Sequence, residues 1–188
     1  MLPNCTRCPA LVANRSRIVH GYGDPNAQLM VVGEAPGYRG GDRTGVPFTS
    51  DRSGRRVQAL LIALGLSAET KPGVPRPRLR GAYVTNVVRC NPPRNRNPSA
   101  SEIANCTPYL LEELASIRPR IVATLGAFAA RWAFAHRLQQ PLPAGIRRLH
   151  GRAWPAGDAT LVTLVHPARA SNAQLALAER VLRDLLAA

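Results

Sequence analysis

The chain has 188 residues, 45% of them hydrophobic, and this length and composition suit a single compact domain spanning residues 1–188. No apolar run approaches the roughly 18–20 residues of a membrane-spanning helix, and the opening Met-Leu-Pro-Asn-Cys lacks a signal-peptide pattern, so a soluble, cytoplasmic protein is expected. The 25 Lys and Arg against 11 Asp and Glu give a net charge of +14, which favours a polyanionic partner, with nucleic acid ahead of a membrane surface.

Short apolar runs alternate with helical patterns along the chain. In chain order the predicted elements are a strand at residues 29–32, a helix at 52–64, a strand at 82–88, a helix at 99–117, a strand at 121–125, a helix at 128–135, a strand at 161–165 and a helix at 173–186. The runs are partly β-branched and show no polar alternation, which is typical of buried parallel strands. Ser99 and Glu102 predict a capping box at the start of one helix.

This alternation predicts an α/β fold, a three-layer α/β/α sandwich around a short, mostly parallel four-stranded sheet. The irregular stretches at residues 71–80, 91–98 and 139–151 are too short to link two domains. Functional sites in such sheets lie at the carboxyl ends of the strands, so the residues that follow each strand are the first candidates.

The four cysteines, Cys5, Cys8, Cys90 and Cys106, are candidates for one metal site. An intracellular protein keeps its thiols reduced, so a tetrahedral thiolate site suits them better than two disulfides. Cys5 and Cys8 form a tight Cys-x-x-Cys pair, whereas Cys90 and Cys106 are too far apart for a second zinc knuckle. The spacing therefore favours an iron–sulfur cluster over structural zinc, and unrelated buried cysteines are the remaining alternative.

Three strand ends carry unusual polar residues. A glycine-rich loop at residues 33–48 follows the first strand; its glycines allow close approach of a flat ligand, but their spacing matches neither a Rossmann fingerprint nor a P-loop. Asn86 interrupts an otherwise apolar strand, where an amide either serves as a structural hydrogen-bond hub or reads a base edge. His166, held before Pro167, is placed for a polar role or a structural one.

These motifs together resemble the iron–sulfur uracil-DNA glycosylases, and the resemblance runs from Cys5 to Asn172. Gly-Glu-Ala-Pro-Gly at 33–37 and Thr-Asn-Val-Val-Arg-Cys at 85–90 are similar to family four of that group. Pro-Phe-Thr-Ser-Asp-Arg-Ser-Gly at 47–54, and Asn172 after His166-Pro167, are similar to family five. The sequence departs from family four at Tyr38, where that family carries an acidic residue.

The resemblance implies a uracil-DNA glycosylase-like fold and a base-flipping enzyme that hydrolyses the N-glycosidic bond of uracil in single- or double-stranded DNA. Other deaminated bases are candidate further substrates. The implied base-binding residues are Gly33, Glu34, Tyr38, Phe48, Asn86 and His166, with Phe48 stacking on the base and Asn86 bonding its Watson–Crick edge. The implied catalytic residues are His166, which stabilises the departing anion, and Asp42, with Glu34 as second choice, which orients the attacking water.

The resemblance also implies DNA contacts, a cofactor and a state of assembly. The implied DNA-binding residues are Arg52, Ser53, Arg169, Ser171 and Asn172. Cys5, Cys8, Cys90 and Cys106 would hold a structural 4Fe–4S cluster. A monomer that works on DNA near the nucleoid, without a membrane partner, is expected.

Two other classes of protein stay open. The Tyr-Arg-Gly-Gly at residues 38–41 leaves room for a non-catalytic uracil-DNA binding protein. A protein that traps uracil-DNA covalently through a histidine is the related alternative, although Arg147-Arg148-Leu149-His150 does not match the basic insert of such a protein. A zinc-stabilised nucleic-acid-binding protein is the third interpretation. A GC-rich coding sequence explains the use of Arg rather than Lys, but it does not explain the shortage of Asp and Glu.

Overall fold

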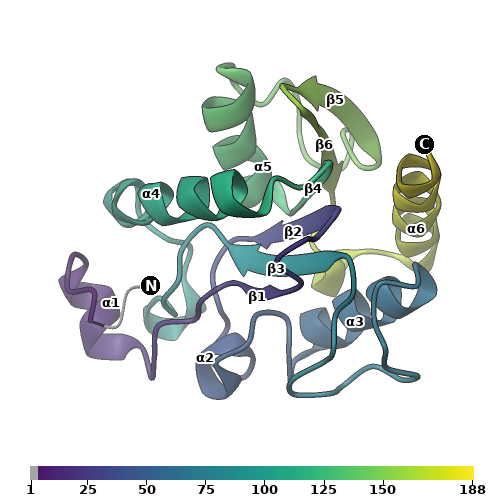
Figure 1. Ribbon diagram of the computed structural model, residues 1–188. Coiled ribbons are helices and arrows are strands. Elements are labelled where there is room, and N and C mark those ends of the chain that lie inside the picture. Colours follow the sequence, from purple (N-terminus) through teal and green to yellow (C-terminus); the bar gives the residue numbers. More distant parts are fainter. Residues whose placement is uncertain (1–3) are drawn as a thin grey trace.

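The computed structural model describes residues 4–188, which form one mixed six-stranded sheet between two layers of helices (Figure 1). The strands lie in the order β1-β3-β2-β4-β6-β5. The four central strands are parallel, and they are β2 (Leu29–Gly33), β3 (Ala82–Asn86), β4 (Ile121–Leu125) and β6 (Ala159–Leu164). The two edge strands, β1 (Tyr22–Gly23) and β5 (Arg152–Ala156), pair antiparallel with β3 and β6.

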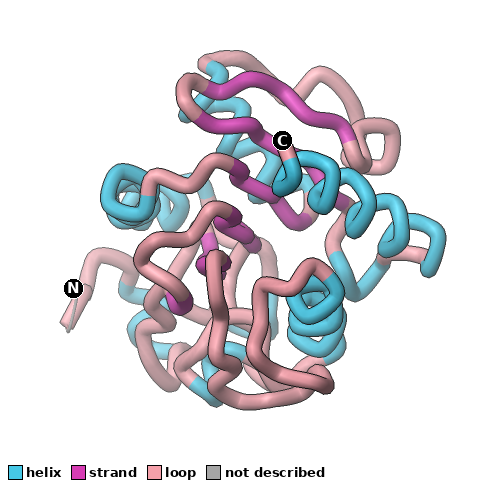
Figure 2. The backbone as a smooth tube through the Cα atoms, turned by 45° about the vertical axis from the view of Figure 1, so that its right-hand side comes forward, coloured by secondary structure: helices cyan, strands magenta, loops and turns pink. Residues whose placement is uncertain are grey.

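Helices cover both faces of the sheet, as the tube in Figure 2 shows. The helices that pack on one face are α1 (Pro9–Asn14), α4 (Ala100–Ile117) and α5 (Ala127–Ala133). Those on the other face are α3 (Arg52–Ala63) and α6 (Asn172–Ala187). The remaining helical turns lie in loops, and they are α2 (Gly41–Thr44), η1 (Pro93–Asn95), η2 (Phe134–Leu138) and η3 (Pro167–Arg169).

The central strands bury both of their faces, which is why their sequences show no polar alternation. In β2, Met30 and Val32 belong to the core beneath α4 and α5, whereas Leu29 and Val31 belong to the core beneath α3 and α6. All five residues of β2 are buried, as are all five of β4. Apolar residues on both faces stabilise the sheet between the two helical layers, since each removes apolar surface from water.

The predicted three-layer α/β/α fold is confirmed, and so are the four parallel strands. The sheet is wider than predicted because β1 and β5 flank those four in residues 4–188. β5 was not predicted because it is mostly exposed and contains Pro155. An edge strand tolerates a proline since one side of the strand needs no hydrogen-bonded partner. The predicted capping box of Ser99 and Glu102 begins α4. None of the helices within residues 4–188 is long and apolar enough to cross a membrane.

Candidate functional site

A cleft of about 660 Å³ opens at the carboxyl ends of the parallel strands. Each of the four strand ends contributes to its wall: Glu34 follows β2, Asn86 ends β3, Gly126 follows β4 and His166 lies two residues after β6. Parallel strands bring these four positions to the same edge of the sheet, although they are far apart in the sequence. The cleft is therefore a direct product of the sheet topology.

Phe48 and Asn86 form a tightly packed wall of the cleft, and Gly33 lies directly behind them. Gly33 pairs with Asn86 across the parallel β2–β3 ladder. A Cβ at Gly33 would lie 2.5 Å from Asn86 Oδ1 and 2.6 Å from Phe48 Cζ, so only glycine leaves room for both side chains. Phe48 has a φ of 54°, a left-handed conformation that costs free energy in a bulky residue. The left-handed backbone of Phe48 and the absence of a side chain at Gly33 together place the ring of Phe48 beside the amide of Asn86.

His166 lies just beyond the carboxyl end of β6 and accepts a hydrogen bond within its own loop. Its Nδ1 accepts a hydrogen bond from the Ala168 N–H at 3.4 Å, which leaves the proton of the neutral ring on Nε2. Burial lowers the pKa of His166, and the positive charge of Arg169 lowers it further, while the carboxylate of Asp51 raises it. The net direction is downward, so the ring is neutral near pH 7 and its Nε2–H is free to donate.

Two carboxylates line the cleft, Glu34 and Asp51. Burial raises the pKa of Glu34, and Arg169 partly offsets this effect. Asp51 is the N-cap of α3, where its Oδ1 accepts from the Gly54 N–H at 2.7 Å. The site therefore offers two carboxylates in one cleft, of which Asp51 is near enough to His166 to raise its pKa; carboxylates suit the stabilisation of a cation and the orientation of a water molecule.

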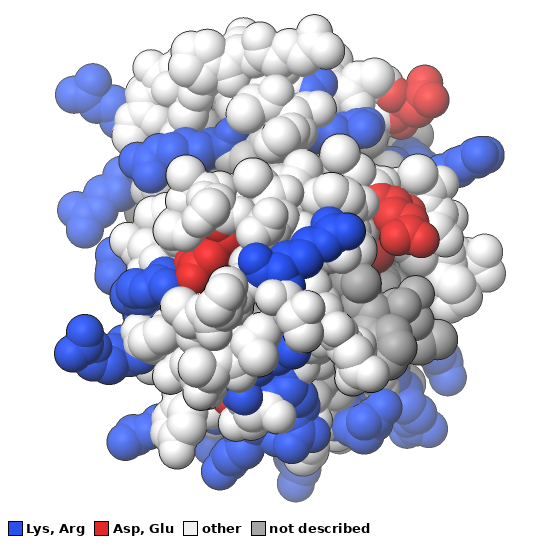
Figure 3. Space-filling model, turned by 90° about the vertical axis from the view of Figure 1, so that its left-hand side faces the viewer, with Lys and Arg blue, Asp and Glu red and all other residues white. Residues whose placement is uncertain are grey.

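The rim of the cleft is basic and carries one exposed aromatic ring. Its exposed arginines include Arg39, Arg147 and Arg169, for which the described part of the chain provides no salt-bridge partner. Tyr38 is 63% exposed at the same rim. Basic side chains also dominate the face of the molecule seen in Figure 3, where acidic side chains are sparse. Exposed arginines and an aromatic ring suit phosphates and unstacked bases.

The four cysteines gather in a corner where α1, α4 and the loop after β3 meet. Arg15 donates to Cys90 Sγ at 3.1 Å and to the carbonyl oxygen of Cys5 at 2.8 Å. Asn105 Nδ2 donates to Cys8 Sγ at 3.4 Å, and the backbone N–H of Arg89 donates to Cys106 Sγ at 3.5 Å. Burial raises the pKa of Cys106 to about 11, and the nearby Cys90 and Cys8 contribute in the same direction.

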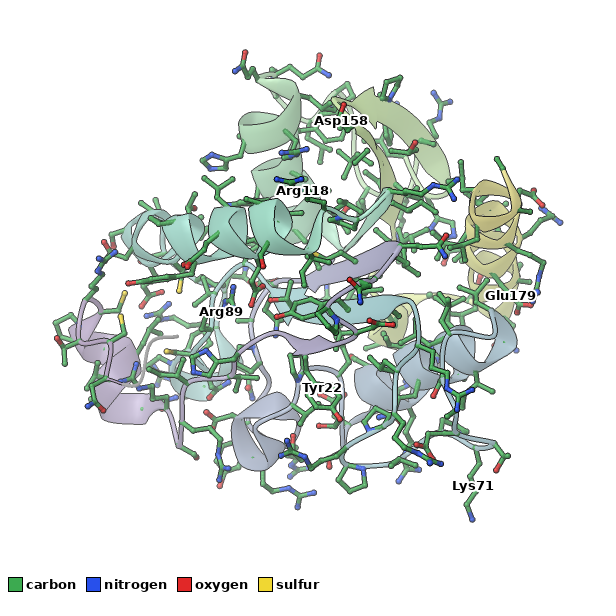
Figure 4. All side chains as sticks on the ribbon, in the orientation of Figure 1. Tyr22, Lys71, Arg89, Arg118, Asp158 and Glu179 are labelled. Carbon is green, nitrogen blue, oxygen red and sulfur yellow. The ribbon has the colours of Figure 1, made fainter. Side chains whose placement is uncertain are left out.

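Arg89 gives this corner an unusual electrostatic character. The residue is only 3% exposed, and its Nη1 donates to Glu113 at 2.6 Å, but its Nε and Nη2 have no hydrogen-bond partner. Figure 4 shows Arg89 beneath α4, toward the α1 end of the molecule. Within residues 4–188 no three His, Cys, Asp or Glu side chains are arranged to hold a metal ion. Four thiols and two unpartnered buried donors nevertheless suit an anionic, thiolate-bound group chemically.

Comparison with protein families shows to which superfamily the chain is related. The model of the uracil DNA glycosylase superfamily matches residues 20–186, which include all four strand ends. The chain belongs to that superfamily.

Three curated relatives of this superfamily member illustrate the similarity. A type-5 uracil-DNA glycosylase of Pyrobaculum aerophilum is 38% identical over 185 residues, covering 88% of this chain and 79% of the relative. A type-4 uracil-DNA glycosylase of Archaeoglobus fulgidus is 36% identical over 131 residues, covering 70% of this chain and 59% of the relative. A type-5 uracil-DNA glycosylase of Thermus thermophilus is 38% identical over 154 residues, covering 72% of this chain and 69% of the relative. The mixture of family-four and family-five motifs agrees with these similarities.

The fold of this superfamily member brings most of the expected site residues together. Those that line the cleft are Glu34, Tyr38, Phe48, Ser53, Asn86, His166 and Arg169. Gly33 lies directly behind Phe48 and Asn86. Arg52 is exposed in the first turn of α3 outside the cleft wall. Ser171 caps α6, with its side chain accepting from the Gln174 N–H, and Asn172 is exposed at the start of that helix; neither lines the cleft.

Asp42 is the expected residue whose position differs most. Its exposed fraction is 0%, it does not line the cleft, and its carboxylate accepts hydrogen bonds from the Ser16 N–H. The reason is local: residues 41–44 form the short helix α2, which turns this side chain away from the cleft and toward the N-terminal segment. The structure thus places Asp42 outside the cleft, whereas an acid that orients the attacking water is expected to line it.

Several cleft residues had not been identified from the sequence. Asp51 lies three positions after Phe48, the expected stacking residue, and lines the cleft. Its position two residues before Ser53, an expected DNA-binding residue, was the feature of the sequence that could have identified it. Asn91 and Asn95 link two loops: Asn91 donates to the carbonyl oxygen of Pro36 at 2.8 Å, and Asn95 accepts from the Tyr38 N–H at 2.9 Å. These bonds connect the cleft wall to the loop that begins at Cys90.

Proposed function

We propose that this protein is a DNA-repair enzyme that removes uracil from DNA by hydrolysing the bond between the base and its deoxyribose. The observation that carries this proposal is the convergence on one cleft of Phe48, from the loop before α3, Asn86, from the end of β3, and His166, from the loop after β6. Membership of the uracil DNA glycosylase superfamily and similarity to proteins named type-4 and type-5 uracil-DNA glycosylases support it. The whole chain then acts as a single catalytic domain and as a monomer.

The base enters the cleft only after it leaves the DNA stack, because the glycosidic carbon is shielded within a duplex. In the proposed complex Phe48 stacks on the extruded ring and Asn86 bonds its Watson–Crick edge. The buried position of Asn86, 3% exposed, makes an unpaired amide costly, so a ligand that bonds it is favoured over one that does not. This difference supports selection of uracil.

Cleavage of the C1′–N1 bond leaves negative charge on the departing base and positive charge on the sugar. The Nε2–H of neutral His166 is proposed to donate to uracil O2 as that charge develops. A neutral donor already oriented by its bond from Ala168 needs no reorganisation during the reaction, which is the basis of oxyanion-type stabilisation. The lowered pKa of His166 keeps the ring neutral, so it adds no charge to the site, and the bond from Ala168 to Nδ1 leaves the ring proton on Nε2.

The sugar cation is stabilised by the two carboxylates of the cleft in this proposal. Asp51 lies close enough to His166 to raise its pKa, so its charge is near the reacting atoms. Glu34 orients the water whose oxygen forms the new bond to C1′ and accepts its proton. Burial supports this role for Glu34, since a raised pKa makes its carboxylate a better base.

The exposed arginines at the rim are proposed to hold the DNA phosphates on either side of the extruded nucleotide. Arg39, Arg147 and Arg169 are free of carboxylate partners in the described part of the chain, so their charges are available. Tyr38, exposed at the same rim, is suited to stack on a neighbouring base rather than to form the pocket floor. A DNA substrate also implies work inside the cell, at the nucleoid.

Cys5, Cys8, Cys90 and Cys106 are proposed to hold a 4Fe–4S cluster that has a structural role. Such a cluster supplies a rigid, anionic link between chain segments, and glycosidic hydrolysis transfers no electron. The buried guanidinium of Arg89, which has two unpartnered nitrogens and whose charge lowers the pKa of Cys106, supports an anionic group near this corner. Cys90 begins the loop that reaches the cleft through Asn91 and Asn95, so the cluster would brace the cleft wall.

Protein purified without oxygen tests the cluster. Absorbance near 400 nm, with about four iron and four sulfide per chain, is expected. Cys106→Ser and Cys90→Ser are each expected to lose this absorbance, while the variant Ser101→Ala, exposed on the same helix as Cys106, keeps it. A colourless protein that carries zinc contradicts the proposal.

An oligonucleotide assay tests the enzyme. A strand that contains one uracil is incubated with the protein, abasic sites are cleaved with alkali, and the products are separated under denaturing conditions. Scission at the uracil position, and none in the thymine control, is expected. Tight binding without scission, or a covalent protein–DNA band, favours the alternative of a binding or trapping protein. Parallel strands with hypoxanthine, xanthine or a thymine mismatch define the substrate range.

A further inference from the structure

The loop that carries His166 and Arg169 has little regular structure of its own. β6 ends at Leu164, and the following turn, η3, is held internally by Arg169 N–H to His166 O at 2.9 Å and by Ala170 N–H to Pro167 O at 3.3 Å. A three-residue turn does not determine its own orientation relative to a sheet. The direction of the His166 ring therefore depends on contacts from outside the loop.

Arg56 supplies one of these contacts from α3. Its Nη1 donates to the carbonyl oxygen of Pro167 at 2.5 Å and to that of Ala170 at 2.9 Å. One guanidinium thus closes both ends of the turn that follows His166. The first turn of the same helix is capped by Asp51, so Arg56 also sets the distance between the histidine loop and this carboxylate.

His150 supplies the second contact from the segment before β5. Its Nδ1 accepts from the Val165 N–H at 3.0 Å, and its Nε2 lies 2.8 Å from the carbonyl oxygen of Gln174 in α6. Because Nδ1 accepts, the ring proton is on Nε2, which donates to Gln174. The backbone on both sides of His150 is attached to β6, since Gly151 N–H donates to the Thr163 carbonyl at 2.8 Å and the Thr163 hydroxyl donates to the Leu149 carbonyl.

Among the described residues, Gln174 is the only other polar residue that borders the space beneath the loop. A crevice of about 20 Å³ lies there, and Arg56 and His150 border it among mainly apolar neighbours such as Leu60, Leu125 and Ala178. A mainly apolar crevice is a poor site for a bridging water, which needs two or more polar partners. Loss of either contact is therefore not replaced by an ordered water within this crevice.

We propose that Arg56 and His150 are positioning residues that clamp the loop at residues 165–170 between α3 and α6 and so direct His166 into the cleft. The inference rests on the proposed function. Neither residue lines the cleft, so both act through the loop rather than on the substrate. Arg56 binds the carbonyl oxygens of Pro167 and Ala170, and His150 binds the N–H of Val165, so the two contacts together fix the orientation of the loop.

The titration of His166 reports the clamp without any enzymatic assay. The four histidines of the chain are labelled with ¹³C, and the His166 signal is identified by its loss in His166→Gln. In the intact protein burial lowers the pKa of His166, with Arg169 acting in the same direction and Asp51 against it. Arg56→Met and His150→Ala release the loop to solvent, and the pKa of His166 is expected to rise toward its ordinary value of 6.5.

Single-turnover cleavage at saturating DNA is the second readout. Arg56→Met and His150→Ala are each expected to lower the cleavage rate by about 10- to 10²-fold, since a catalytic group misplaced by about 1 Å costs up to that factor. His150→Asn keeps an acceptor for the Val165 N–H and is expected to recover much of the rate lost in His150→Ala. The matched controls are Arg55→Met, exposed on the same helix as Arg56, and His136→Asn, which is exposed.

The two readouts separate the clamp from the proposed function. An unchanged His166 titration in both Arg56→Met and His150→Ala overturns the clamp, whatever the activity. A raised pKa in both variants supports the clamp even if the intact protein cleaves no uracil, a result that contradicts the proposed function alone. Where Arg56→Met does not fold, Arg56→Gln, which keeps one donor group, is measured in its place against the same criterion.

Discussion

Gly33→Ala is the smallest change that tests the proposed base pocket. It adds one methyl group at the end of β2, next to the two side chains proposed to hold the base. Gly33 is not among the residues with positive φ, so alanine adopts the same backbone without strain. The consequence is therefore steric and confined to the wall formed by Phe48 and Asn86.

The structure sets the size of the effect. The new Cβ lies 2.5 Å from Asn86 Oδ1 and 2.6 Å from Phe48 Cζ. Relief of both overlaps to an ordinary contact requires each group to retreat by about 0.8–0.9 Å. A displacement of about 1 Å in a positioning group costs about 10²-fold in rate, or about 2.7 kcal/mol of transition-state stabilisation. Overpacking costs about 1–3 kcal/mol of folding stability in addition.

The assay is single-turnover cleavage of a uracil oligonucleotide, with thermal unfolding measured in parallel. Gly145→Ala is the matched control, because a Cβ at that position meets no atom within 4 Å and its φ is ordinary. The control is expected to retain the wild-type rate. A folded Gly33→Ala protein that cleaves uracil at the wild-type rate refutes the reasoning, since Phe48 and Asn86 would then not need their present positions.

Further predictions concern the charges of the cleft. His166→Ala is expected to lower the single-turnover rate by about 10²-fold, and a loss below threefold contradicts its role as donor. Because burial raises the pKa of Glu34, its carboxylate protonates at a higher pH than an ordinary glutamate does; activity should therefore fall early on the acid side, and Glu34→Gln should lower the rate and abolish this acid limb in a pH–rate profile. Asp51→Asn keeps an N-cap for α3, so the melting temperature is expected to stay within about 2 °C while the pKa of His166, measured by NMR, falls further. In titrations of DNA affinity against salt, each replacement of a rim arginine by methionine should reduce the slope of log K against log[salt] by about 1, and an unchanged slope contradicts phosphate contact for Arg39, Arg147 or Arg169.

The sequence was informative where a single segment decides the outcome. The buried runs that became β2, β3, β4 and β6 were recognisable because both of their faces are apolar. The capping box of Ser99 and Glu102 marked the start of α4 for the same local reason. Asn86 and His166 were candidates because a polar residue at the end of a buried strand is costly unless it has a partner or a ligand.

The sequence could not indicate which of two aspartates, Asp42 or Asp51, faces the cleft. Asp42 and Asp51 lie in the same loop, and their residue types are identical. Only the fold turns Asp42 to the Ser16 N–H and Asp51 to the cleft, because Asp42 lies within the short helix α2 and Asp51 is the N-cap of α3. The roles of Arg56 and His150 were equally hidden, since their partners lie 111 and 15 residues away.

What the sequence determined by itself was the layered fold, the strand ends that meet at one edge, and a basic surface suited to DNA. What only the tertiary structure decided was which carboxylates face the cleft, how the cysteine corner is bonded, and what holds the histidine loop. The physical reason is that periodicity and capping act over a few residues. The direction of a side chain in a loop depends on atoms that folding brings from distant segments.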